Sequence, residues 1–84
     1  YDPQGRKYGE ELLPGVIWCG SSLEAATGAD ILVVMTEWNE FRALNLKAAK
    51  RVMRGDVLVD LRNIYQPRDA IAAGFNYSSI GRPL

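Results

Sequence analysis

Two short apolar runs, each followed by polar residues, dominate the pattern of the chain. Residues 31–35 are apolar at every position rather than at alternate positions, which is typical of a central strand covered on both faces. Residues 57–59 form the second run, which ends in Asp60 and, after one leucine, Arg62. A buried parallel strand shows this pattern where it reaches the carboxyl edge of its sheet. We therefore predict two parallel strands, at 31–35 and 57–60.

Helix signals separate these runs. Asn45 is a suitable N-cap, and a helix that begins there places its apolar side chains on one stripe and its basic ones on a solvated face, and it ends before Gly55. The remaining predicted elements are helices at 6–13, 22–27 and 67–73, a short helix that carries Phe41 and Leu44 inward, and strands at 16–19 and 75–81. Strands joined by helical crossovers predict an α/β fold, a Rossmann-like three-layer parallel sheet with right-handed connections.

The polar residues after the second strand are the first candidates for function. Open α/β sheets bind ligands outside the carboxyl ends of their strands, and Arg62 is the first cation there. A guanidinium offers several fixed donors to a phosphate or to sugar hydroxyls. The strand pattern alone leaves a second interpretation open, in which Arg62 only pairs with Asp60 or caps a neighbouring loop.

Composition narrows the function classes. The chain has 84 residues, enough for one small domain, and its ten basic and ten acidic side chains give a formal net charge of zero. Nothing in this balance favours binding to nucleic acid or to a membrane surface. The longest apolar run, 31–35, is too short to span a bilayer, and no basic-then-apolar signal segment opens the chain. We expect a soluble, cytoplasmic protein.

Cys19 is the single cysteine, and the sequence has no histidine. An internal disulfide and a thiolate metal cluster are therefore excluded, and any acid or base chemistry would fall to Asp, Glu, Lys or Tyr. Cys19 lies within the apolar run 16–19, where a small buried hydrophobe is the expected role. We predict no metal ligand in this chain.

Several segments, taken together and in order, resemble the C-terminal UDP-binding domain of the UDP-glucose 6-dehydrogenase (UDP-glucose/GDP-mannose dehydrogenase) family. They are Tyr1-Asp2-Pro3, Thr36-Glu37-Trp38 with Phe41, Asp60-Leu61-Arg62-Asn63-Ile64-Tyr65, Gly74-Phe75, and Tyr77 to Ile80 with Gly81-Arg82-Pro83. The resemblance covers essentially all 84 residues. It implies that the chain is part of an enzyme that oxidises the C6 alcohol of a UDP-sugar to a carboxylate in two NAD-dependent steps.

The resemblance also assigns roles to single residues. The family's Asp-x-Arg falls on Asp60 and Arg62, and Arg62 is expected to contact the UDP moiety. Thr36 and Glu37 are expected to be polar contacts at the neighbouring strand end. For Trp38 and Phe41, and equally for Tyr65, packing in the core competes with a role in the site, and for the first two packing is favoured.

Other family segments are not found in these residues. The sequence has no Gly-x-Gly-x-x-Gly fingerprint, so the resemblance implies that NAD binds to an N-terminal domain outside this chain. The family's Gly-x-Cys nucleophile segment and its lysine-containing segment do not occur either, and Cys19 does not match the former. We expect that the 84 residues alone catalyse nothing and that their partners are a UDP-sugar and the rest of the dehydrogenase.

The opening residues resemble the end of the family domain's second strand, so the first strands of the sheet are expected to be missing. Strand 31–35 would then have an open edge. We expect either that segment 16–19 moves against this edge, or that the fragment associates through it; the whole enzyme is expected to be a homo-oligomer. Three alternatives stay open: a dehydrogenase for UDP-N-acetyl-hexosamine or GDP-mannose, a non-catalytic nucleotide-binding module, and a structural α/β domain without a ligand.

Overall fold

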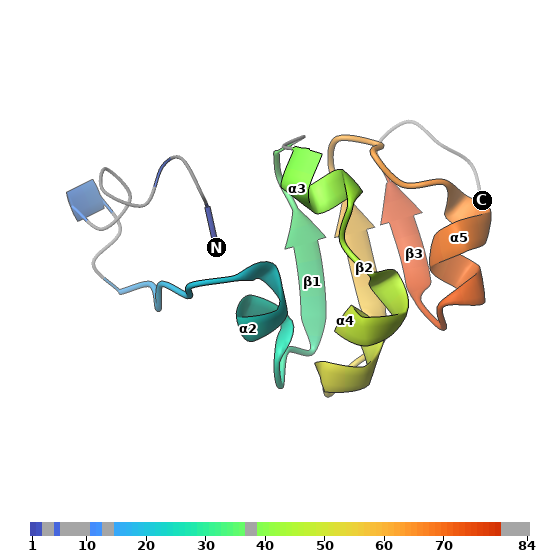
Figure 1. Ribbon diagram of the computed structural model, residues 1–84, viewed down its shortest axis with the longest axis horizontal. Coiled ribbons are helices and arrows are strands. Elements are labelled where there is room, and N and C mark those ends of the chain that lie inside the picture. The colour runs from blue at the N-terminus through green and yellow to red at the C-terminus, as the bar shows by residue number, and fades with distance from the viewer. Residues whose placement is uncertain (3–4, 6–10, 13–14, 37–38, 80–84) are drawn as a thin grey trace.

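A three-stranded parallel sheet forms the centre of the protein. The computed structural model describes residues 1–2, 5, 11–12, 15–36 and 39–79. Strands β1 (Ile31–Val34), β2 (Val57–Asp60) and β3 (Asn76–Ser79) lie in the order β1-β2-β3 (Figure 1). Their register pairs Val34 with Asp60 and Asp60 with Ser79. The carboxyl ends of all three strands therefore meet at one edge of the sheet.

The helices of the described residues cover one face of this sheet. Helices α3 (Asn39–Arg42) and α4 (Leu46–Val52) connect β1 to β2, and α5 (Pro67–Ala72) connects β2 to β3. Both connections step one strand in the same direction, so right-handed crossovers bring α4 and α5 to the same face. Helix α2 (Ser22–Ala26) packs against α4 and so belongs to the same layer (Figure 1). The predicted α/β, Rossmann-like parallel sheet is confirmed and is open; of the three predicted layers, the described residues form the sheet and one helix layer.

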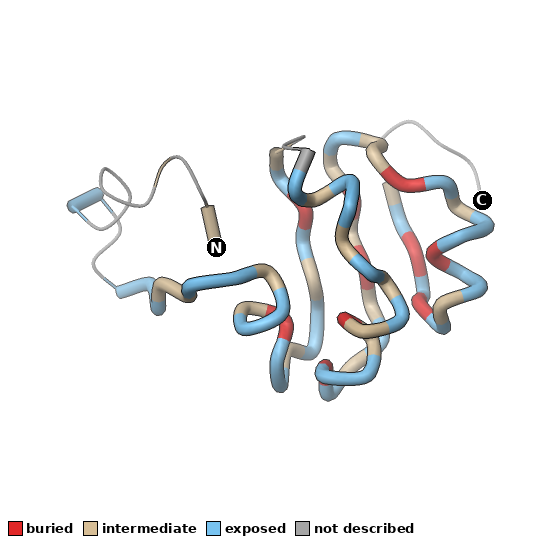
Figure 2. Tube along the Cα trace, viewed as in Figure 1, coloured by how far each residue is buried: buried red, intermediate tan, exposed pale blue. Residues whose placement is uncertain are grey.

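Burial alternates across the sheet as this single helix layer requires. Leu58 and Tyr77, which are neighbours in the register, are 0% and 1% exposed on the helix-covered side. On the opposite face Ile31 and Val33 are 54% and 46% exposed (Figure 2). The expectation that strand 31–35 is covered on both faces was wrong, because the described residues place a helix layer on only one of them.

The predicted strand at 16–19 was also wrong. Residues 17–19 have no regular structure, and Ile17 is 87% exposed. The four residues are apolar, but a strand needs a hydrogen-bonded neighbour, and among the described residues β1 pairs only with β2. Most of the predicted helix at 6–13 and the tail from Ile80 onward lie outside the described residues. The helix from Asn45 is confirmed as α4, with the Asn45 side chain accepting from the backbone N–H of Ala48.

The core lies between the sheet and the helix layer. Small residues let these layers approach closely, since Ala26 on α2, Ala49 on α4 and Ala70 on α5 are all fully buried. The larger core side chains are Val34, Met53, Leu58, Tyr65, Phe75 and Tyr77. Because two of these are tyrosines, the core must supply partners for two buried hydroxyl groups.

A close backbone contact fixes the turn after α4. The N–H groups of Arg54 and Gly55 both donate to the carbonyl of Ala29, and a Cβ at Gly55 would overlap the backbone carbonyl of Asp30. The Arg54 guanidinium also pairs with the Asp30 carboxylate through two contacts, at 2.7 and 2.6 Å. Only glycine fits at position 55 while this turn stays against the start of β1.

Candidate functional site

A buried carboxylate organises the carboxyl edge of the sheet. Asp60 ends β2 and is 0% exposed. Its Oδ1 accepts a hydrogen bond from the backbone N–H of Arg62 at 3.1 Å. Its Oδ2 accepts from the backbone N–H of Tyr65 at 2.9 Å and from the hydroxyl of Tyr77 at 2.8 Å. The loop 61–65 is thus folded around one charged side chain.

Asp60 remains ionised at neutral pH in spite of its burial. Burial raises the pKa of this carboxyl, but hydrogen bonds from Tyr65, Tyr77, Ile64 and Arg62 outweigh burial and hold the pKa below its usual range. Because the acceptor is ionised, each of these hydrogen bonds is stronger than a hydrogen bond between two neutral groups. The negative charge of Asp60, which lies beneath the loop, therefore stabilises the conformation of the loop.

The loop carries Arg62 outward and returns Tyr65 to the core. Arg62 is exposed. Asn63 has a φ of 55°, in the left-handed region that asparagine tolerates better than most residues, and this conformation reverses the chain. Tyr65 is only 6% exposed, and its hydroxyl donates to the backbone carbonyl of Phe41 at 2.6 Å. The packing interpretation of Tyr65 and of half-buried Phe41 is therefore supported by their positions.

The loop after β1 forms the second part of this edge. Thr36 is half-buried there, in the position that follows Met35. Glu37 and Trp38 lie outside the described residues, so their predicted roles stay predictions. The structure thus brings Thr36 and Arg62 to the same edge of the sheet, since the strands that precede them are paired in parallel.

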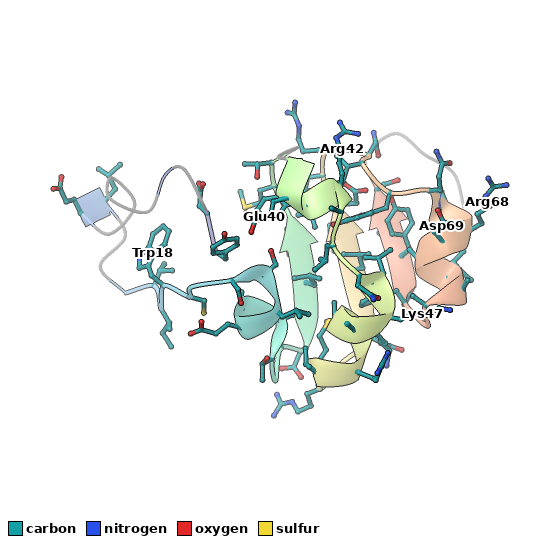
Figure 3. All side chains as sticks on the ribbon, viewed as in Figure 1. Trp18, Glu40, Arg42, Lys47, Arg68 and Asp69 are labelled. Carbon is teal, nitrogen blue, oxygen red and sulfur yellow. The ribbon has the colours of Figure 1, made fainter. Side chains whose placement is uncertain are left out.

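Two hollows lie beside this edge. One, of about 380 Å³, runs along β1 and is mostly apolar, with Thr36 and Trp18 among its lining residues. The other, of about 490 Å³, lies between the start of α4 and α5, and its lining includes Arg42, Lys47 and Asp69, which Figure 3 labels. The first hollow thus offers the hydroxyl of Thr36, and the second offers two cations beside the Asp69 carboxylate; both kinds of donor suit phosphate or sugar oxygens.

Metal and membrane sites find no support among the described residues. No group of three or more Cys, Asp or Glu side chains there is placed to hold a metal ion. Within the same residues, no helix has the length and apolar character needed to cross a bilayer. Cys19 is half-buried, and its thiol is not part of a disulfide.

Tyr77 is the residue of this edge that sequence reasoning missed. The sequence predicted its strand but gave its side chain no role. The signal was present in the alternation of Phe75, Tyr77 and Ser79, because alternate strand residues share one face. What the sequence could not supply was the register that sets Tyr77 opposite Leu58 and within reach of Asp60.

Comparison with known proteins identifies the class to which this fold and edge belong. Residues 1–67 match the family model described as "UDP-glucose/GDP-mannose dehydrogenase family, UDP binding domain". The chain therefore belongs to this family, as the resemblance of its loops had indicated, and the matched part includes both Thr36 and Arg62.

Three individual relatives are each named UDP-glucose 6-dehydrogenase. A UDP-glucose 6-dehydrogenase of Rhizobium meliloti is 48% identical over 83 residues, which is 99% of this chain and 19% of the relative. One of Pseudomonas aeruginosa is 44% identical over 63 residues, 75% of this chain and 14% of the relative. One of Bacillus subtilis is 31% identical over 83 residues, 98% of this chain and 19% of the relative. The chain thus spans about a fifth or less of the length of these relatives.

Proposed function

We propose that this chain is part of the C-terminal UDP-sugar-binding domain of an NAD-dependent UDP-glucose 6-dehydrogenase. The observation that carries the proposal is the exposed Arg62 on a loop held by a buried carboxylate, in a chain that belongs to the UDP binding domain family. The enzyme would convert UDP-glucose to UDP-glucuronate by two successive oxidations at C6. Its product would serve as a polysaccharide precursor, made in the cytoplasm.

In this proposal Arg62 contacts the UDP moiety, because its fork of donors suits phosphate oxygens and sugar hydroxyls. Thr36 and Glu37 add polar contacts from the neighbouring strand end. Asp60 was predicted as a further contact. Its complete burial favours an action through the loop instead of direct contact with the nucleotide.

The turns after β1 and β2 do not have the residues that NAD binding requires. A dinucleotide turn needs glycines where the backbone approaches the pyrophosphate, whereas the turns that follow β1 and β2, at 35–38 and 61–66, contain no glycine. We therefore propose that NAD and the catalytic groups belong to other parts of the dehydrogenase, and that these 84 residues alone are inactive. The partners of the chain are then a UDP-sugar and the rest of the enzyme.

Association through the sheet edge is a further part of the proposal. Among the described residues β1 has no strand beyond it, and its Ile31 and Val33 side chains are about half exposed. An apolar edge strand of this kind pairs readily with another strand. Within the enzyme this edge would be covered by the rest of the polypeptide or by another subunit of a homo-oligomer.

The test is UDP-glucose-dependent reduction of NAD by the full-length protein. We expect two NADH for each UDP-glucose, and a raised KM for UDP-glucose in Arg62→Ala. Arg68 on α5 offers a matched control, because its side chain is exposed and points away from the sheet (Figure 3). Equal KM values for the Arg62→Ala variant and the parent would contradict the proposed contact.

This assay, together with measurements of UDP binding and of stability, separates the alternatives. Turnover of UDP-N-acetyl-hexosamine or GDP-mannose in place of UDP-glucose would establish a dehydrogenase for another nucleotide sugar. UDP binding by the full-length protein without any turnover would favour the non-catalytic module. A stability change in Arg62→Ala without loss of nucleotide affinity would favour the structural α/β domain.

A further inference from the structure

We propose that Tyr77 is a positioning residue for nucleotide binding, which acts through the Asp60 carboxylate to hold the loop that carries Arg62. This inference rests on the proposed function and extends it to a residue of β3. Neither the strand pattern nor the resemblance of the loops gave Tyr77 a role in the site.

The geometry supports an indirect action. Tyr77 is 1% exposed, so its ring cannot reach a ligand in solvent, and its hydroxyl donates to Asp60 Oδ2 at 2.8 Å. The same hydroxyl lies 3.2 Å from the backbone carbonyl of Tyr65, at the end of the loop. A hydroxyl has one proton, and the shorter contact to a charged oxygen is the stronger of the two. Tyr77 thus holds the carboxylate, and it acts on the loop through Asp60.

Loss of the Tyr77 hydroxyl would affect Arg62 through two hydrogen bonds. One joins Tyr77 to Asp60, and the other joins Asp60 to the backbone N–H of Arg62. The carboxylate would keep the backbone N–H groups of Arg62, Ile64 and Tyr65 as donors but lose the hydroxyl of Tyr77. A buried charge with fewer donors gains by rotating toward water or by taking up a proton, and either change weakens its hold on the Arg62 backbone. The loop would then have to be ordered when the nucleotide binds, and that cost reduces affinity.

The test is a double-mutant cycle on UDP affinity, measured by calorimetry with UDP and the full-length protein. We expect Tyr77→Phe to weaken UDP binding about tenfold, since hydrogen bonds to charged groups contribute on that order. In the Arg62→Ala background the same substitution should change the affinity little, because the residue through which it acts is gone. Tyr1→Phe is the matched control, since its hydroxyl also donates to a carboxylate, that of Glu40.

Two results would overturn the inference: UDP affinity unchanged in Tyr77→Phe, or an equal loss of affinity whether or not Arg62 is present. The second result would mean that Tyr77 supports the domain in general. Failure of the proposed function would give results that differ from these two. The parent protein would not bind UDP, or Arg62→Ala would bind as tightly as the parent, and the inference would then fall with the function on which it rests.

Hydrogen exchange gives a readout that does not depend on affinity. In the full-length protein without UDP, the backbone amides of 62–65 should exchange faster in Tyr77→Phe than in the parent. In Tyr1→Phe these amides should exchange at the same rate as in the parent. Unchanged exchange in Tyr77→Phe would contradict the proposed link between Tyr77 and the loop. The far-UV circular dichroism of each variant checks that the protein is folded.

Discussion

Substitution of Asp60 by asparagine should loosen the loop above β2 more than any other single-atom change in this part of the fold. The carboxylate accepts the backbone N–H groups of Arg62 and Tyr65 and the hydroxyl of Tyr77, and a backbone hydrogen bond from Ile64 also stabilises its charge. An asparagine retains one acceptor oxygen. If this oxygen faces Tyr65 and Tyr77, the amide nitrogen faces the N–H of Arg62, and that hydrogen bond is lost.

The magnitude is worked from the three hydrogen bonds whose distances are given above, those from Arg62, Tyr65 and Tyr77. One hydrogen bond to a charged acceptor disappears, and two others fall from charged to neutral strength, which together amount to about 3 kcal/mol. A loss of that size raises the population of the open loop about a hundredfold. The expected result is therefore about hundredfold faster amide exchange across 62–65 in the full-length Asp60→Asn variant, measured by hydrogen–deuterium exchange.

Asp56→Asn provides the control for this measurement. Asp56 directly precedes β2, its side chain is exposed, and the same change of charge there should alter loop exchange by no more than a few fold. Equal exchange across 62–65 in the two variants would refute the reasoning. It would mean that the loop is held by its own backbone and not by the buried charge.

Two further predictions concern stability. Gly55→Ala should destabilise the protein by roughly 1–3 kcal/mol in urea unfolding, because the added Cβ overlaps the Asp30 carbonyl, while Gly15→Ala, in open space, should have little effect. Burial, with the nearby charge of Asp60, raises the pKa of Tyr65 from 10.0 to about 12, so its contribution to stability is present below pH 10 and is lost as the pH rises toward 12. The unfolding midpoint of Tyr65→Phe should therefore decline less steeply over that pH range than that of the parent; parallel curves would contradict the shift.

The three strands at the centre of the sheet were predicted from the sequence, including β3 within the predicted range 75–81, but the burial of β1 was not. Ile31–Val34 and Val57–Asp60 are apolar runs that end in polar residues, and both form strands. Residues 16–19 have the same character but no ladder partner among the described residues, so composition alone gave a wrong strand. The pattern also could not say which face of β1 a helix would cover, because that depends on the direction of each crossover.

The candidate site was predictable in its position but not in its internal order. An arginine after a buried strand pointed to the carboxyl edge, and Arg62 is exposed there. The sequence grouped Asp60 with the ligand contacts, whereas the structure buries it beneath the loop. Its partner Tyr77 is distant in sequence and reaches Asp60 only through the pairing of β2 with β3, a non-local contact that no local pattern encodes.

Calorimetric titration of the full-length protein with UDP tests the central claim most directly. The claim is that Arg62, held above the carboxyl edge by Asp60, contacts the nucleotide. It predicts that Arg62→Ala weakens UDP binding at least about tenfold, the expected contribution of a charged hydrogen bond, while Arg68→Ala binds as the parent does. Equal affinity in all three proteins would contradict the account, because Arg62, the residue on which the proposed contact rests, would then have no part in binding.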